Sequence, residues 1–312
     1  MTAKAPWRQV LERHAPLILP SVADALTARL VELAGFPAYQ IGGFALTAAM
    51  HAYPDIDLEQ FAENHTKAQE IIEACDLPVL VDADDGYGDV KNVTRTVRGY
   101  ERIGASALFI EDQKPPKRCG HMSGKTVVPP EFMEAKIRAA VAARSTPDFF
   151  LLARTDAIEP NGLEDAIERG KRYLDAGADS IYVEGPRTRQ ELEKVGKAFG
   201  DVPLATSLLE RGGRTPWVPP SEMHAMGYAM ILYPTTVLFR VVRSIQLGLV
   251  DLREGRPLSV EHSVDLQEFE SIVRMQDWAD IENRFMYEEH GDGLIDRIKE
   301  AVTGNGRKAV NE

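Results

Sequence analysis

The sequence predicts an α/β fold, namely a (β/α)8 TIM barrel with extra C-terminal helices, from two observations. Eight short apolar runs with strand character are spread along the chain, and segments with helical spacing separate most of them. Strands that alternate with helices about eight times are typical of a parallel sheet closed into a barrel. An open, doubly wound sheet is the alternative, but eight units within about 230 residues match the usual size of a barrel.

The expected strands are short and continuously apolar, as strands buried on both faces should be. They are residues 17–19, 38–41, 79–83, 107–111, 149–153, 180–184, 202–206 and 229–233. Four of them follow a glycine at the end of a helical segment: Gly35, Gly104, Gly177 and Gly227. Glycine ends a helix in this way because it adopts the left-handed conformation that other residues resist.

Helices are expected where apolar or small side chains recur at helical spacing, as in residues 60–75, 130–143 and 163–177. Cys75 falls on the apolar face of the first segment, which predicts a core position. Residues from about 240 to 312 are mostly helical and polar, and too few for a second barrel-sized core. We therefore expect one domain, 1–312, whose C-terminal helical extension packs on the barrel or is swapped with a neighbouring subunit.

Composition narrows the classes of partner. The 312 residues include 36 Lys and Arg against 48 Asp and Glu, a formal net charge of −12. Nucleic-acid binding normally leaves a basic footprint, so this balance argues against such a partner. Two cysteines are too few for a disulfide framework, and no apolar run reaches the ~18 residues that cross a bilayer. A cytoplasmic protein with no membrane partner is expected.

Acidic side chains gather at the predicted strand ends, where barrels of this kind carry their chemistry. Asp82 and Asp84 follow the third strand, and Glu111 ends the fourth. Converging carboxylates repel one another unless a cation joins them, and Mg²⁺ prefers such oxygen ligands. Helix N-caps are the alternative reading of these acids. Zinc is less favoured, because no His and Cys cluster has ligand spacing.

The segment between the fourth and fifth strands, residues 112–132, is long and rich in charge. Long ordered loops are usually functional. Cationic neighbours are expected to lower the pKa of the Cys119 thiol, which would make it a better acid or nucleophile. The same cations could hold substrate carboxylates. A mobile basic loop with an incidental cysteine is the alternative.

Four motifs carry a family resemblance: VDADDGYGD (81–89), IEDQ (110–113), PKRCGHMSGK (116–125) and LLARTDA (151–157). In this order and spacing they resemble the isocitrate lyase/phosphoenolpyruvate mutase superfamily. The likeness covers about residues 15–250 and is greatest to the short members that cleave C–C bonds, of the 2-methylisocitrate lyase and 2,3-dimethylmalate lyase type. Members with phosphorus–carbon chemistry carry a different sequence in place of KRCGH, so phosphonate chemistry is disfavoured.

The resemblance implies a barrel, often a tetramer in which a C-terminal helix packs on a neighbouring subunit. It also implies Mg²⁺ or Mn²⁺ and small 2-hydroxy or 2-oxo di- and tricarboxylate substrates. By motif, Asp84 would bind the metal directly, and Asp82 and Glu111 would hold metal-bound waters. Arg154 would bind the substrate near the breaking bond. The gating motif would be Lys117, Arg118, Cys119, Gly120 and His121, with Asp55 and Glu184 beside the site.

Two departures fall on expected substrate contacts. After the second strand the chain reads Tyr39-Gln40-Ile41-Gly42-Gly43-Phe44, which keeps backbone amide donors but lacks the hydroxyl of the family pattern. After the seventh strand, Ser207 or a neighbour occupies the position of the family's Asn. The apolar Phe44, Leu208 and Trp217 suggest a less polar substituent than methylisocitrate carries.

These observations support a magnesium-dependent lyase. Tyr39 or a metal-polarised water would deprotonate the substrate's 2-hydroxyl. Arg154 and loop cations such as Lys117 would stabilise the enolate-like product, and Cys119 would protonate it. An oxaloacetate hydrolase or decarboxylase on the same metal site is the alternative. A non-catalytic barrel that binds a metabolite is a third reading, and the complete set of acids argues against it.

Overall fold

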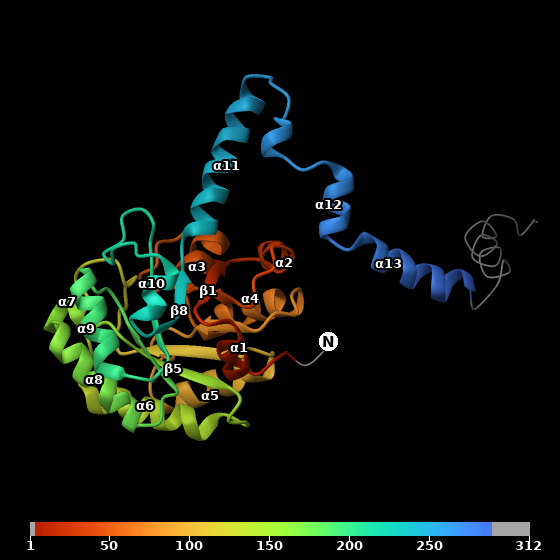
Figure 1. Cartoon of the computed structure of the whole chain (residues 1–312). Coiled ribbons are helices and arrows are strands. Elements are labelled where there is room, and N and C mark those ends of the chain that lie inside the picture. Colours follow the sequence, from red (N-terminus) through yellow and green to blue (C-terminus); the bar gives the residue numbers. More distant parts are fainter. Residues whose placement is uncertain (1–3, 289–312) are drawn as a thin grey trace, which may run out of the picture. The chain divides into compact units, whose positions relative to one another are not determined.

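The computed structural model describes residues 4–288 and shows the predicted closed barrel (Figure 1). Its eight strands are all parallel and pair in sequence order, β1 with β2 through to β8 with β1, so the open sheet is excluded. They are β1 (Leu17–Val22), β2 (Tyr39–Ile41), β3 (Val79–Asp82), β4 (Ala107–Glu111), β5 (Phe150–Thr155), β6 (Ser180–Val183), β7 (Leu204–Ser207) and β8 (Tyr228–Tyr233).

Helices alternate with the strands and most of them cover the outside of the barrel, whereas α1 precedes β1 and α11 extends away from the barrel. They are α1 (Trp7–His14), α2 (Ala25–Leu33), α3 (Gly43–His51), α4 (Phe61–Glu73), α5 (Val90–Arg102), α6 (Pro130–Ala143), α7 (Ile158–Asn161), α8 (Leu163–Asp175), α9 (Arg189–Phe199), α10 (Pro220–Ala225) and α11 (Thr236–Arg253). Gly104 and Gly227, after α5 and α10, have φ of +90° and +102°, the conformation predicted for helix-ending glycines.

The apolar side chains form two buried layers. Inward-facing residues such as Leu19, Leu80 and Phe150 fill the barrel, and Trp7 of α1 packs among them. Outward-facing residues such as Ile41, Val81 and the predicted core residue Cys75 pack against the helices. Because the strands are covered on both faces, apart from the exposed Ile18 of β1, the barrel is a rigid frame for groups at the strand ends.

The chain divides into two compact units between Val250 and Asp251. The first contains the barrel and most of α11. The second contains the short helix η1 (Val260–His262), α12 (Leu266–Ile272), α13 (Met275–Glu282) and η2 (Asn283–Glu288). Residues 289–312 of the predicted extension lie outside the described residues. None of the helices within 4–288 is long and apolar enough to cross a membrane.

Candidate active site

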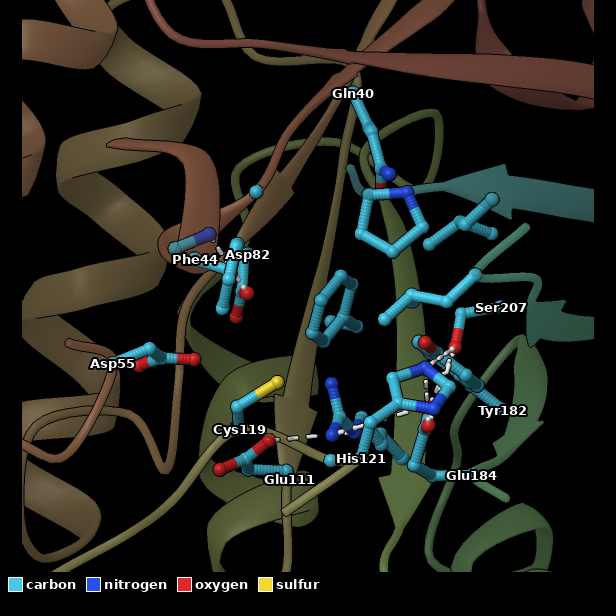
Figure 2. Close-up of a pocket in the computed structure, with 18 of the residues that line it drawn as sticks. Gln40, Phe44, Asp55, Asp82, Glu111, Cys119, His121, Tyr182, Glu184 and Ser207 are labelled. Carbon is cyan, nitrogen blue, oxygen red and sulfur yellow. Dashed lines mark hydrogen bonds and ion pairs between the residues drawn. The ribbon is translucent and has the colours of Figure 1, made fainter. Parts of the chain in front are cut away.

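A pocket opens at the carboxyl ends of the strands, and most of the predicted site residues meet there (Figure 2). Its lining is Gln40, Gly42, Gly43, Phe44, Asp55, Asp82, Phe109, Glu111, Lys117, Arg118, Cys119, Gly120, His121, Arg154, Tyr182, Glu184, Ser207, Leu209, Leu232, Pro234 and Thr235. Asp55 and Asp82 lie on one side, and Tyr182, Glu184 and Ser207 on the other. The strand order explains this split, because β2 and β3 are on the far side of the barrel from β6 and β7.

Asp82 ends β3 and is held by two backbone donors. The amide of Gly43 donates to Oδ2 at 3.0 Å, and the amide of Asp84 donates to Oδ1 at 3.0 Å. A Cβ on Gly43 would lie 3.2 Å from Asp82 Oδ2 and 3.5 Å from Asp84 Oδ1. The two carboxylates therefore converge on the start of α3, where a larger side chain would crowd Asp82.

Asp84 does not line the pocket itself but reaches it through Lys117. The Lys117 ammonium lies 2.5 Å from an oxygen of Asp84 and 2.5 Å from an oxygen of Asp55. Burial alone would lower the pKa of Lys117, but Asp84 and Asp55 raise it well above its ordinary value. Burial raises the pKa of Asp84 to about 7, against the opposing effect of Lys117. The loop thus supplies a fixed positive charge to the acids of β3.

Glu111 and Arg154 end adjacent strands and are paired in the sheet register. Arg154 Nε lies 3.3 Å from Glu111 Oε2 and 2.9 Å from Asp156 Oδ2, and its guanidinium stacks 5.0 Å from the ring centre of Tyr182. Burial strongly raises the pKa of Glu111. Burial opposes ionisation of Asp156, but Arg154 and Lys125 lower its pKa far below the ordinary value. Glu111 and Asp156 therefore hold one side of the Arg154 guanidinium, and its other side faces the pocket.

The donor set fits an oxygen-preferring divalent cation. Asp82, Asp84 and Glu111 offer carboxylate oxygens, and Glu111 Oε1 is buried without a hydrogen-bond partner within the described chain. No group of three or more His, Cys, Asp or Glu side chains in residues 4–288 is arranged to hold a metal ion by itself. Such a site suits Mg²⁺, which keeps several waters and takes few protein ligands.

The loop between β4 and α6 is closed over the pocket. The side chain of Gln113 both donates to the carbonyl of Arg118 and accepts from its amide, at 2.7 and 2.9 Å. The amide of Cys119 donates to the carbonyl of Asp55 at 3.1 Å. Lys125 is buried, pairs with Asp156 at 2.8 Å and donates to the carbonyl of Gly120. These contacts bring the cysteine motif against both sides of the barrel mouth.

The Cys119 thiol is directed toward the middle of the pocket. Burial, with Asp55 nearby, raises its pKa to about 11. The expected lowering by loop cations is wrong, because Lys117 and Lys125 are already neutralised by carboxylates and the thiol is largely buried. At neutral pH Cys119 is a protonated thiol, which suits an acid rather than a nucleophile.

His121, Ser207 and Glu184 form a hydrogen-bonded cluster. The amide of Arg214 donates to His121 Nδ1 at 3.3 Å, so the ring proton of the neutral imidazole is on Nε2. Nε2 lies 3.0 Å from Ser207 Oγ, and that hydroxyl donates to Glu184 at 3.0 Å. Burial lowers the pKa of His121 and favours the neutral ring. Since Nε2 is a donor, it cannot take the serine proton, and the cluster is not a hydrolytic triad.

Three residues singled out in the sequence lie elsewhere. Tyr39 is fully buried in the outer layer beside Cys75, and burial raises its pKa far above the usual range. Its proposed role as base is therefore wrong. Leu208 is also in the outer layer, and Trp217 is 60% exposed, so neither lines the pocket. Phe44 does line it and packs against Phe239 of α11.

Sequence reasoning missed several lining residues: Gln40, Phe109, Tyr182, Leu209, Leu232, Pro234 and Thr235. Four of them lie inside strands rather than after them. Every second residue of a strand points into the barrel, but a strand that is buried on both faces shows no alternation in its sequence. The one signal in the sequence was Gln40, a polar residue in an otherwise buried strand.

Comparisons with known proteins agree with this geometry. Residues 7–252 match the protein family described as phosphoenolpyruvate phosphomutase. The chain is 34% identical to 2,3-dimethylmalate lyase of Eubacterium barkeri, over 91% of this chain and 99% of the relative. It is 39% identical to a probable 2-methylisocitrate lyase of Corynebacterium glutamicum, over 76% of this chain and 77% of the relative.

Solved structures show the same fold. An oxaloacetate acetylhydrolase bound to the inhibitor 3,3-difluorooxalacetate matches with a TM-score of 0.85 and 32% identity, over 91% of this chain and 97% of that one. A phosphonopyruvate hydrolase in complex with oxalate and Mg²⁺ matches with a TM-score of 0.80 and 27% identity, over 90% and 98%.

Proposed function

Because the chain belongs to the phosphoenolpyruvate phosphomutase family, we propose that it is a divalent-metal-dependent carbon–carbon lyase. Its substrate is a small 2-hydroxy di- or tricarboxylate, like 2-methylisocitrate or 2,3-dimethylmalate, and its products are a 2-oxo acid and a carboxylate. One observation carries this proposal. The cysteine of a closed loop faces the same small pocket as a buried arginine and the acids that end β3 and β4.

Metal binding, substrate binding and proton donation are assigned to different residues of the chain. Asp84 would hold the metal, with Asp82 and Glu111 on its waters, and this all-oxygen donor set suits Mg²⁺ or Mn²⁺. When bound, the cation would acidify the substrate's 2-hydroxyl, and a metal-polarised water would take the proton of that hydroxyl, because Tyr39 lies outside the pocket. Arg154 binds the carboxylate that becomes enolate-like, and the Lys117 charge lies beside it. The Cys119 Sγ–H then donates its proton to the carbanion carbon.

Substrate contacts are proposed for the residues on the remaining walls. The amide of Gly42, the N-cap of α3, would receive a carboxylate, as helix N-termini do, whereas the amide of Gly43 already donates to Asp82 and would be shared between Asp82 and the substrate. Phe44 closes the side above them, and Asp55 holds Lys117 in place. Arg118, Gly120 and His121 would cover the substrate from the loop, while Glu184 and Ser207 contact it from β6 and β7.

Purified protein offered 2-methylisocitrate and 2,3-dimethylmalate with Mg²⁺ tests the proposal. We expect pyruvate with succinate or propionate, identified by mass spectrometry, and complete loss of turnover with EDTA that excess Mg²⁺ reverses. Cys119→Ser should lower kcat about 10²- to 10⁴-fold, the usual contribution of a general acid, while Mg²⁺ binding is unchanged. Unaltered turnover in this variant would refute the acid role.

Oxaloacetate hydrolysis or decarboxylation is the second candidate, favoured by the likeness to oxaloacetate acetylhydrolase. The metal and residues that would bind a 2-oxo acid in the lyase reaction would also bind oxaloacetate for hydrolysis or decarboxylation. Acetate and oxalate, or CO₂, formed from oxaloacetate without any 2-oxo acid from the hydroxy diacids would replace the lyase proposal. Phosphonate chemistry is less supported, because the loop carries KRCGH. A non-catalytic metabolite-binding barrel predicts no turnover of any of these compounds.

The proposal includes a cytoplasmic homo-oligomer, a tetramer by resemblance, with no nucleic-acid or membrane partner. Cys75 and Cys119 are free thiols, which suits a reducing compartment. An apolar groove runs along α2, β1 and β8, and α11 exposes apolar side chains along its length. A second copy of the chain is the proposed cover for these surfaces.

A further inference from the structure

We infer that Gln40 is a specificity-determining residue, whose side-chain amide binds an acceptor oxygen on the substrate substituent that points into the barrel. This inference rests on the proposed function and concerns the same pocket. Gln40 lies in the middle of β2 and is 2% exposed. Figure 2 shows its side chain extending from the strand toward the pocket that it lines.

The amide of Gln40 has an unused donor. Its Nε2 is buried and has no hydrogen-bond partner in the described part of the chain. The register partner on β1 is Ser21, whose hydroxyl could accept a hydrogen bond, but Ser21 Oγ is unpartnered as well. A buried amide without a partner is costly, so a polar group in this position indicates a ligand.

The place of Gln40 in the barrel identifies which part of the substrate it would meet. Gln40 pairs in register with Leu80, two residues before Asp82, so it lies roughly 7 Å deeper along the strands than the acids. Its register neighbours Ser21 and Leu80 carry no charge, and the same lining includes the uncharged Leu232 of β8 and Pro234. Gln40 therefore lies too deep to reach the substrate carboxylate that meets Arg154. It can reach a substituent that points into the barrel.

The chemistry of the amide then selects the substituent. The Nε2 group donates to an oxygen, and a carboxylate gives the stronger, charge-assisted hydrogen bond. An alkyl substituent leaves the donor unsatisfied, and sites built with such a donor discriminate strongly against the analogue that lacks the acceptor. A carboxymethyl group in this position is favoured over a methyl group. This reverses the sequence expectation of a less polar substituent.

Paired substrates test the inference. 2-Methylisocitrate and 2,3-dimethylmalate differ in that one carries carboxymethyl where the other carries methyl. We expect the wild type to have a kcat/KM at least about tenfold higher for 2-methylisocitrate. Gln40→Met keeps the length of the side chain but removes the donor, and should abolish this preference by lowering kcat/KM for 2-methylisocitrate about tenfold more than kcat/KM for 2,3-dimethylmalate. Gln40→Glu should lower turnover of 2-methylisocitrate further, by repulsion.

Leu80→Met is the matched control, because Leu80 is the inward-facing register neighbour outside the pocket lining. It should leave the preference intact, and thermal unfolding should show that all variants fold. A wild type that prefers 2,3-dimethylmalate, or an unchanged preference in Gln40→Met, would overturn the inference.

If neither substrate is cleaved, the proposed function fails and a binding experiment decides about Gln40. The probes are tricarballylate and methylsuccinate, which differ by the same two groups, titrated calorimetrically with Mg²⁺ present. Binding of tricarballylate at least about tenfold tighter by wild type, and equal affinities for Gln40→Met, would support the inference. Equal wild-type affinities, or no binding of tricarballylate, would overturn it.

Discussion

At the scale of single residues, burial of the Cys119 thiol sets the pH range in which it can act. Its pKa is raised from an ordinary 9.0 to about 11, so the thiol remains protonated through the neutral range. Folding therefore keeps a proton that the unfolded chain would release, and this contribution to stability is complete below about pH 9 and lost as pH rises through about 11. We expect alkylation of Cys119 by iodoacetamide, followed by peptide mass spectrometry, to increase over that interval. An apparent pKa near or below 9 would contradict the assignment of the thiol as an acid.

Lys125 joins the loop to the arginine site, because its ammonium contacts both Asp156 and the carbonyl of Gly120. Asp156 in turn holds Arg154. Lys125→Met would leave a buried carbonyl without a donor and weaken both attachments, each costing about 1–3 kcal/mol. We expect kcat to fall by about ten- to hundredfold and alkylation of Cys119 to become faster, as the loop opens more often. Lys114→Met, at an exposed position of the same loop, is the control and should change neither rate.

At the scale of elements, the closed loop depends on a close approach at Gly120. A Cβ at this position would lie 2.4 Å from Arg154 Nη2 and 2.7 Å from Cγ of Glu184. Both side chains are buried and held by neighbours, so neither can move aside easily. Gly120→Ala should therefore lower kcat/KM about a hundredfold or more, with little change in the midpoint of thermal unfolding. Ser123→Ala in the exposed part of the loop serves as the control, and equal losses in both variants would show that the approach is unimportant.

The eight strands were predictable from the sequence, but several of their ends were not: β1 runs to Val22 rather than residue 19, and β5 to Thr155 rather than residue 153. The direction of side chains within a strand was not predictable either. Residues 107–111 form β4 as predicted, and Glu111 lies in the pocket because it ends that strand. The short strand β2 is apolar or buried on both faces, so no alternation showed that Tyr39 points outward and Gln40 inward. The closed position of the 112–132 loop could not be predicted from the sequence either, since it depends on partners such as Asp55 and Asp156 that are distant in sequence.

At the scale of the whole molecule, α11 presents an apolar stripe that the described chain leaves uncovered. Val241, Ile245 and Leu249 are spaced four residues apart and are 43%, 56% and 59% exposed. Residues at this spacing share one helix face, and a continuous exposed apolar face is typical of a subunit interface. Phe44 lines the pocket and packs against Phe239 of α11. An interface formed by α11 would therefore be linked to the pocket wall through this contact.

Light scattering after gel filtration tests this assembly. The wild type should have a mass about four times the 34.6 kDa of one chain. Ile245→Asp with Leu249→Asp should dissociate it, because each charge would have to be buried without a partner in the interface. Activity should fall with dissociation, since Phe239 supports the pocket wall from α11. Gln246→Glu, a polar change on the same helix, should leave the mass unaltered. A wild type that remains monomeric at micromolar concentration would show that another partner, or solvent alone, covers the stripe.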